Sequence, residues 1–168
     1  ASPLTGTAPS AAPEWGKEVV RQFGRLPVQD GGRIKPLETL ARFKLLKFNG
    51  KTTFKVGDTL RTPVEWLLDF LFYPDRAERY KTFVVDNAEV LDALGLPHEN
   101  KRDHYSYMDL FPARQKLFEL AQQYAHKDAR ERTPVETQLV NLGDNFQEFA
   151  QLASTLDFAR RDFAVKGI

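Results

Sequence analysis

The stretch LPVQDGGRIKPLETLAR, residues 26–42, combines a tight turn, a polar cluster and a helix start. Asp30, Gly31 and Gly32 separate two short apolar stretches, and glycines at such points supply the positive φ that a hairpin turn requires. Pro36 follows, and proline suits a first helical position because its φ is preset and no useful donor is lost there. The stretch therefore predicts a small β-hairpin followed by a helix that begins at Pro36.

The predicted hairpin should present Gln29, Asp30, Arg33 and Lys35 side by side, and we take these four residues as the candidate binding site. In one interpretation they are structural: Asp30 bonds the turn amides and Arg33 bonds helix-end carbonyls. In the other, Arg33 and Lys35 face outward and bind an anionic group, which Arg can hold bidentately. The sequence leaves both interpretations open.

Length and composition bound the possibilities. The 168 residues are 42% hydrophobic and 28% charged, which is ordinary for a soluble globular domain with a sizeable core. The 24 basic residues are offset by 23 acidic ones, so nucleic acid is not an expected partner. No apolar run approaches the roughly 20 residues that span a bilayer. The absence of cysteine excludes disulfides and thiolate metal sites.

The chain divides into two parts. Residues 1–13 are rich in Pro, Ser, Thr, Gly and Ala, with Leu4 as their one sizeable apolar residue, so we expect a flexible leader or linker. The start at Ala1, without Met, suggests a processed or truncated beginning. Residues 14–168 are expected to form a single, mostly helical domain.

Apolar periodicity and capping signals predict the elements of this domain. We expect a helix that Gly24 ends, a helix over 36–50, and a weak strand within 51–56. Thr62 and Thr133 each begin a Thr-Pro-Val-Glu capping box, and the run from Trp66 to Tyr73 after the first box is apolar enough for a buried helix.

Farther along, the pattern predicts a strand at 83–85 and a helix that Asp86 caps and that runs to Gly95. A polar loop over 96–105 should follow, and then a helix that begins at the box-like start of Ser106 and Asp109 and ends at about His126. Apolar residues then alternate steps of four and three through a long last helix, up to Leu156. The resulting fold class is mainly α with a minor β component: about six helices, a small β-hairpin and a long C-terminal helical hairpin.

The three histidines give a weaker signal. His98 and His104 are six residues apart in the predicted loop and are candidate haem ligands, because imidazole binds haem iron and metals. However, no Cys-x-x-Cys-His or His-Glu-x-x-His motif is present, so no metal site is predicted. No nucleophile elbow or phosphate-cradling glycine loop is present either, and we expect no catalysis from the domain alone.

Residues 27–42, PVQDGGRIKPLETLAR, resemble a segment of bacterial cytochrome c biogenesis proteins of the CcsA/ResC (system II) type, where it precedes the membrane-embedded region. Weaker similarities follow in Asn49–Lys51 and in Tyr105–Leu110. The Trp-rich haem-handling motif and the membrane histidines of that family are absent, so their roles cannot be assigned to residues here.

The resemblance implies the soluble periplasmic domain of a membrane-bound cytochrome c synthase assembly, tethered to the inner membrane in the full-length protein. Its expected role is to position haem or apocytochrome c for thioether attachment beside other biogenesis subunits, with any haem bound through the parent protein. Arg33 and Lys35 would then meet a haem propionate, a lipid phosphate or a partner carboxylate.

Two other classes of function stay open. One is a structural or protein–protein interaction module of a cell-envelope membrane complex, which the helical seam and the apolar run of residues 66–73 also allow. The other is an enzyme whose site only folding assembles, and its sign would be a deep pocket in which His104 meets several carboxylates.

Overall fold

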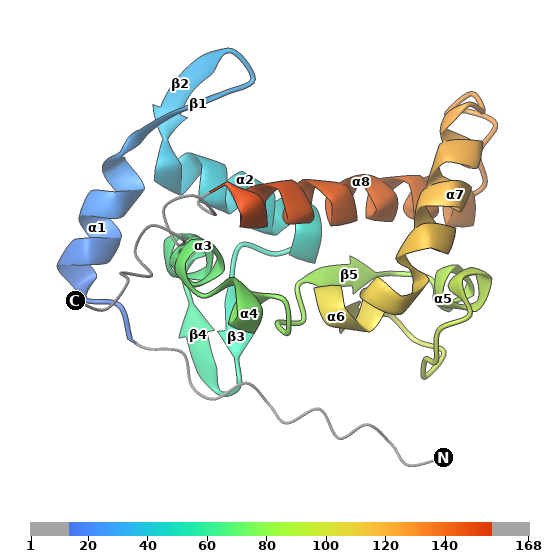
Figure 1. Cartoon of the computed structure of the whole chain (residues 1–168), viewed down its shortest axis with the longest axis horizontal. Coiled ribbons are helices and arrows are strands. Elements are labelled where there is room, and N and C mark those ends of the chain that lie inside the picture. Colours follow the sequence, from blue (N-terminus) through green and yellow to red (C-terminus); the bar gives the residue numbers. More distant parts are fainter. Residues whose placement is uncertain (1–13, 156–168) are drawn as a thin grey trace, which may run out of the picture.

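The computed structural model describes residues 14–155, and within them short antiparallel strand pairs lie among packed helices (Figure 1). The predicted fold class, mainly α with a minor β component, is confirmed. The predicted leader of residues 1–13 and the last seam residue, Leu156, lie outside the described residues. The elements are α1 (Lys17–Arg25), β1 (Pro27–Asp30), β2 (Arg33–Pro36), α2 (Leu37–Asn49), β3 (Phe54–Val56), β4 (Thr59–Arg61), α3 (Pro63–Phe72), α4 (Pro74–Ala77), β5 (Phe83–Val85), α5 (Ala88–Leu94), β6 (Asp103–Tyr105), α6 (Tyr107–Leu110), a 3-10 turn (Phe111–Ala113), α7 (Arg114–Ala125) and α8 (Pro134–Ser154).

The predicted hairpin is present as β1 and β2, and it projects from the body of the molecule between α1 and α2 (Figure 1). Gly31 and Gly32 form its turn with φ of 59° and 76°, which explains why glycine occupies both positions. The helix that follows begins at Leu37, not at Pro36 as predicted. Pro36 keeps an extended ψ of 145° because it is still paired with Pro27 in the ladder.

Gly24 does not end the first helix, as the sequence suggested, but lies buried inside it. A Cβ at this position would lie 3.3 Å from a methyl of Val64 and 3.4 Å from Cβ of Glu38. The glycine therefore serves close packing of α1 against α2 and α3, and the helix continues to Arg25.

Both predicted capping boxes are formed. Thr62 Oγ1 accepts from the Glu65 amide at 3.3 Å while the Glu65 carboxylate accepts from the Thr62 amide at 3.1 Å, and Thr133 makes the same reciprocal pair with Glu136. The helix that the first box begins, α3, is a core helix as predicted: its residues from Trp66 to Leu71 are all buried, whereas Phe72 is 47% exposed.

Strand pairing corrects the predicted loop over residues 96–105. Residues 103–105 form β6, which pairs antiparallel with β5 so that Val84 faces His104. The short polar sequence gave no sign of this strand, because a partner twenty residues away supplies the hydrogen bonds. β4, which pairs with β3 across the turn at Gly57, was not predicted either.

Two helix boundaries also differ from the predictions. The side chain of Asn87, not Asp86, caps α5 by accepting from the Glu89 amide at 2.9 Å. The predicted helix over 106–126 starts at the expected capping box of Ser106 and Asp109, but it is divided into α6, a 3-10 turn and α7. Pro112 lies in the middle turn, where it cannot donate to a continuous helical ladder.

The core is an aromatic cluster that α8 closes. Phe149 of α8 lies 4.5 Å, centroid to centroid, from Phe70 of α3 and 5.1 Å from Phe83 of β5. Tyr107 of α6 stacks on both Phe146 and Phe149 of α8. The last helix therefore holds together elements from most of the described chain.

The predicted C-terminal helical hairpin is formed by α7 and α8. Gly143 lies at a close contact between the two helices, since a Cβ there would be 2.6 Å from Cβ of Ala121. Glycine lowers intrinsic helix propensity, but packing against α7 requires it at this position. The second half of α8 continues beyond α7 and covers the aromatic core.

We expect Gly143→Ala to lower the free energy of unfolding by about 1–2 kcal/mol, although alanine is the better helix former, because overpacking at a rigid contact outweighs propensity. Urea denaturation measures the change. Ala121→Gly should restore part of the loss in the double variant, and Gln147→Ala on the exposed side of α8 serves as the control. Equal or higher stability of Gly143→Ala would contradict the close contact.

Candidate functional site

The structure separates the four residues of the candidate site. In the β1–β2 ladder Asp30 faces Arg33, Val28 faces Lys35, and Gln29 faces Ile34. Side chains of directly opposed residues lie on the same side of a sheet, and successive residues alternate. Asp30, Arg33 and Lys35 therefore share one face of the hairpin, and the prediction that Gln29 lies beside them is wrong.

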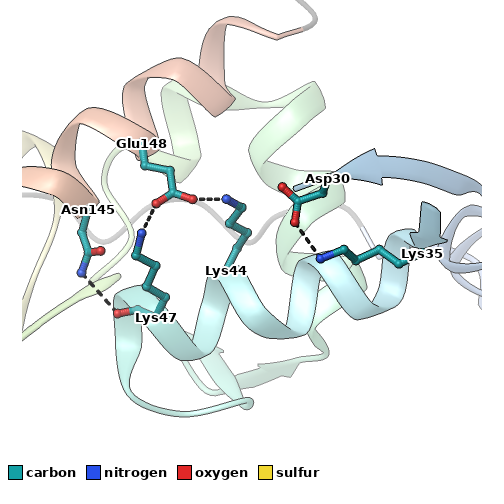
Figure 2. Close-up of polar contacts among 6 residues, drawn as sticks. All are labelled: Asp30, Lys35, Lys44, Lys47, Asn145 and Glu148. Atoms are coloured by element: carbon teal, nitrogen blue, oxygen red, sulfur yellow. Dashed lines mark hydrogen bonds and ion pairs between the residues drawn. The ribbon is translucent and has the colours of Figure 1, made fainter. Parts of the chain in front are cut away.

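Asp30 and Lys35 form an ion pair across the hairpin, with Lys35 Nζ 2.7 Å from Asp30 Oδ2 (Figure 2). The hydrogen bond from Lys35 lowers the pKa of Asp30. Lys35 Nζ also lies 5.8 Å from the ring centroid of Phe43, at cation–π distance. Asp30 and Lys35 thus join the hairpin to α2, which is a structural role. The contacts differ from the structural interpretation of the sequence, in which Asp30 bonds the turn amides and Arg33 bonds helix-end carbonyls.

Arg33 differs from its two neighbours. It is exposed beside the glycine turn, and no hydrogen bond or ion pair of its side chain is found within residues 14–155. The adjacent Ile34 is 78% exposed on the other face of the hairpin. The projecting turn therefore offers a guanidinium and an apolar side chain to a partner.

A row of lysines on α2 continues from the hairpin (Figure 2). Lys44 and Lys47 both bind the carboxylate of Glu148 on α8, and Asn145 of α8 donates to the carbonyl of Lys47 at 3.3 Å. Burial, with the nearby charges of Lys47 and Lys35, lowers the pKa of Lys44 against the opposing effect of Asp30. This surface is electropositive, and Glu148 compensates one end of it.

Both candidate haem ligands are engaged in internal contacts. Nε2 of His98 lies 2.7 Å from Asp92 Oδ1, and its Nδ1 accepts from the Asn100 amide at 2.9 Å. Nε2 of His104 bonds the carbonyl oxygen of Asn49 at 3.1 Å. Within residues 14–155 no three His, Asp or Glu side chains are grouped so that they could hold a metal ion.

His104 also lines a surface hollow of about 480 Å³ between the β3–β4 pair and β6. The other charged residues lining it are Asp103 and three lysines, Lys51, Lys55 and Lys81. The hollow is thus basic, and it does not bring together the several carboxylates that an acid–base enzyme site around His104 would require.

The buried carboxylate of Asp69, which joins several parts of the fold, was not identified from the sequence. Asp69 of α3 accepts from Trp15 Nε1 at 2.7 Å and from the Tyr80 hydroxyl at 3.1 Å, and Arg61 Nε lies 3.5 Å away. Burial raises the pKa of Asp69, although these three groups act in the opposite direction. The signal in the sequence was its position as the one charge within the apolar run of residues 66–73. Its contacts are all structural.

Comparison with known proteins does not assign a family: no protein-family model matches the chain, and no curated protein matches it significantly.

We expect Lys35→Gln to raise the pKa of Asp30 toward the ordinary value for aspartate, because the charged donor that stabilises the carboxylate is removed. Titration of the Asp30 carboxyl by NMR measures the shift. Lys55→Gln is the matched control, since it removes a lysine remote from Asp30 in the other basic hollow. An unchanged Asp30 titration in Lys35→Gln would refute the ion pair.

The raised pKa of Asp69 predicts a pH dependence of stability. The pKa of Asp69 is higher in the native state than in the unfolded state. Between these two pKa values the native state binds more protons, so Asp69 makes the free energy of unfolding fall as pH rises. Asp69→Asn should flatten the stability curve in that interval, as followed by urea denaturation at successive pH values. The same substitution at exposed Asp58 should leave the curve unchanged. Parallel curves for wild type and Asp69→Asn would contradict this assignment.

Proposed function

We propose that this chain is the periplasmic domain of a membrane-bound cytochrome c biogenesis protein of the system II type, and that it positions haem or apocytochrome c without catalysing a reaction alone. One observation carries the proposal. The residues that resemble that family, 27–42, form one continuous unit: the β1–β2 hairpin, which projects from the body, and the first part of α2, which anchors it there. Recognition elements commonly project in this way from a rigid body.

The chemistry of this unit suits an amphipathic anionic partner. Arg33 can hold a propionate or peptide carboxylate bidentately, whereas the ion-paired Lys35 is less available. Exposed apolar side chains accompany it: Ile34 is 78% exposed and Phe43 of α2 is 58% exposed. A porphyrin edge or an apolar segment of apocytochrome would bury such side chains, at a gain of about 25 cal/mol per Å².

In this proposal the domain works beside other biogenesis subunits and is tethered to the inner membrane by segments of the parent protein. The haem-attachment chemistry belongs to those segments. Among residues 14–155 themselves, no helix combines the length and apolar character needed to cross a bilayer.

A second candidate function is a structural interaction module of a cell-envelope membrane complex. The exposure of Ile34 and Phe43 favours it equally, because apolar side chains at a projecting hairpin suit a protein partner as well as haem. The two functions differ in whether haem or apocytochrome binds to the domain.

We expect Arg33→Ala to weaken binding of haemin, or of a peptide containing the Cys-x-x-Cys-His attachment motif, about tenfold, the effect of losing one charge-assisted contact. Absorbance titration measures haemin binding, and fluorescence anisotropy measures peptide binding. The melting temperature should stay unchanged because the Arg33 side chain is exposed. Arg130→Ala, in the exposed turn between α7 and α8, is the control.

His98→Ala/His104→Ala tests the haem-ligand candidates in the same titration. If the absorbance change on haemin binding is lost in that double variant, these histidines are haem ligands. If the absorbance change is the same as in the wild type, neither histidine is a haem ligand. If neither haemin nor the peptide binds the wild-type domain, while membrane subunits co-purify with the full-length protein, the interaction module is the correct function.

A further inference from the structure

Positive charge is concentrated in one part of the chain. Residues 17–51, which include α1, the hairpin and α2, contain nine basic and three acidic residues. The remaining residues contain 15 basic and 20 acidic ones. The near-neutral total therefore conceals a basic N-terminal region and an acidic remainder, an asymmetry that favours an anionic ligand for the basic region.

Part of this charge converges on a hollow of about 340 Å³ between α1, α2 and the start of α3. We call it the arginine hollow. Lys17, Arg21 and Arg25 line it from α1, where their spacing of four residues places them on one face. Arg42 lines it from α2, and Thr62, Pro63 and Val64 complete it at the start of α3.

The cations of the hollow exceed its anions. Glu38 is the one acidic residue that lines it. Arg21 is paired with Glu18 on α1, with Nη2 2.6 Å from Oε1. For Lys17, Arg25 and Arg42, no ion pair is found within residues 14–155. Like charges that line one hollow repel each other, and a bound anion would relieve the repulsion.

Packing fixes how closely the helices that carry the basic side chains approach each other. Buried Gly24 lets α1 approach Val64 of α3 and Glu38 of α2 closely, as described above. This contact brings the arginines of α1 toward Arg42. The first amides of α3 are already partly satisfied by the capping box of Thr62 and Glu65, so side chains would be the main donors to a ligand.

We propose that the arginine hollow binds a phosphate-class anion, which either a free phosphate or phosphate ester, or the headgroup of an anionic phospholipid, would supply. Guanidinium groups match the oxygens of a phosphate bidentately, and several can bind one phosphate from different sides. The volume admits a phosphoryl group with part of an attached moiety. The proposal does not depend on the function proposed above. Glu38 and Arg42 lie within residues 27–42, but Arg33, Ile34 and Phe43, the side chains that would meet haem or apocytochrome, do not line the hollow.

Other basic surfaces are better compensated. Lys44 and Lys47 share Glu148, and Lys35 is paired with Asp30. In the hollow beside His104, Lys81 is paired with Asp109, and Asp103 also lines the wall. More positive charge is unpaired in the arginine hollow than on these two surfaces, so an added anion would gain more there.

In the first arm of the test, the full 168-residue chain is titrated with inorganic phosphate at constant ionic strength and followed by NMR. We expect saturable shifts confined to the amides of α1, α2 and the start of α3. Arg25→Gln/Arg42→Gln should weaken binding at least about tenfold, because two charge-assisted contacts are lost. Both side chains are exposed and glutamine suits helices, so the variant should fold.

Lys116→Gln/Arg130→Gln removes two exposed positive charges elsewhere and is the matched control. It should bind phosphate like the wild type, which separates a local site from an effect of net charge. The second arm replaces phosphate with vesicles of phosphatidylcholine, with and without phosphatidylglycerol, in a sedimentation assay. Binding that needs phosphatidylglycerol and is lost in Arg25→Gln/Arg42→Gln identifies the ligand as a lipid headgroup.

Binding of inorganic phosphate without vesicle binding identifies a free phosphate or phosphate ester. The proposal is overturned if neither phosphate nor anionic vesicles bind, or if both double variants behave alike in both arms. Haemin and apocytochrome binding, measured as above, should be unaffected by Arg25→Gln/Arg42→Gln, so failure here is distinguishable from failure of the proposed function.

Discussion

The structure depends on the ring of Phe149. It contacts Phe48 of α2, Phe70 of α3, Phe83 of β5 and Tyr107 of α6, so one side chain near the end of the described chain joins four elements. Aromatic pairs of this kind add about 0.5–1.5 kcal/mol each beyond the area that they bury. Because the strand pairs are too short to hold together alone, this cluster gives the fold its rigidity.

The same packing orients the surface features. With its buried side held on the aromatic core, α2 presents its lysines outward, and Glu148, one residue before Phe149, reaches Lys44 and Lys47. The hairpin is attached to α2 through Asp30, Lys35 and Phe43. The hairpin and the arginine hollow therefore lie beside the same helix but offer different side chains, so two ligands need not compete.

Local signals in the sequence predicted much of this fold, whereas contacts between residues far apart in the chain could not be predicted. The glycine turn, both capping boxes and the last helix rest on neighbouring residues, and all were found. β6 depends on pairing with β5, and the sequence of the candidate site could not show that Gln29 lies on the other face. Gly24 was predicted to end the first helix, because its close packing against α2 and α3 cannot be seen in the local sequence.

The position of Phe149 also has a kinetic consequence. Its partners Phe48 and Phe70 are separated from it by 101 and 79 residues of chain, so closing the core requires long loops to form. A ribosome or translocation channel that has released only residues up to about 130 would leave α3 without its cover. Such a nascent chain would be prone to aggregation, so chaperone binding to the exposed apolar surface would matter most before the last helix emerges.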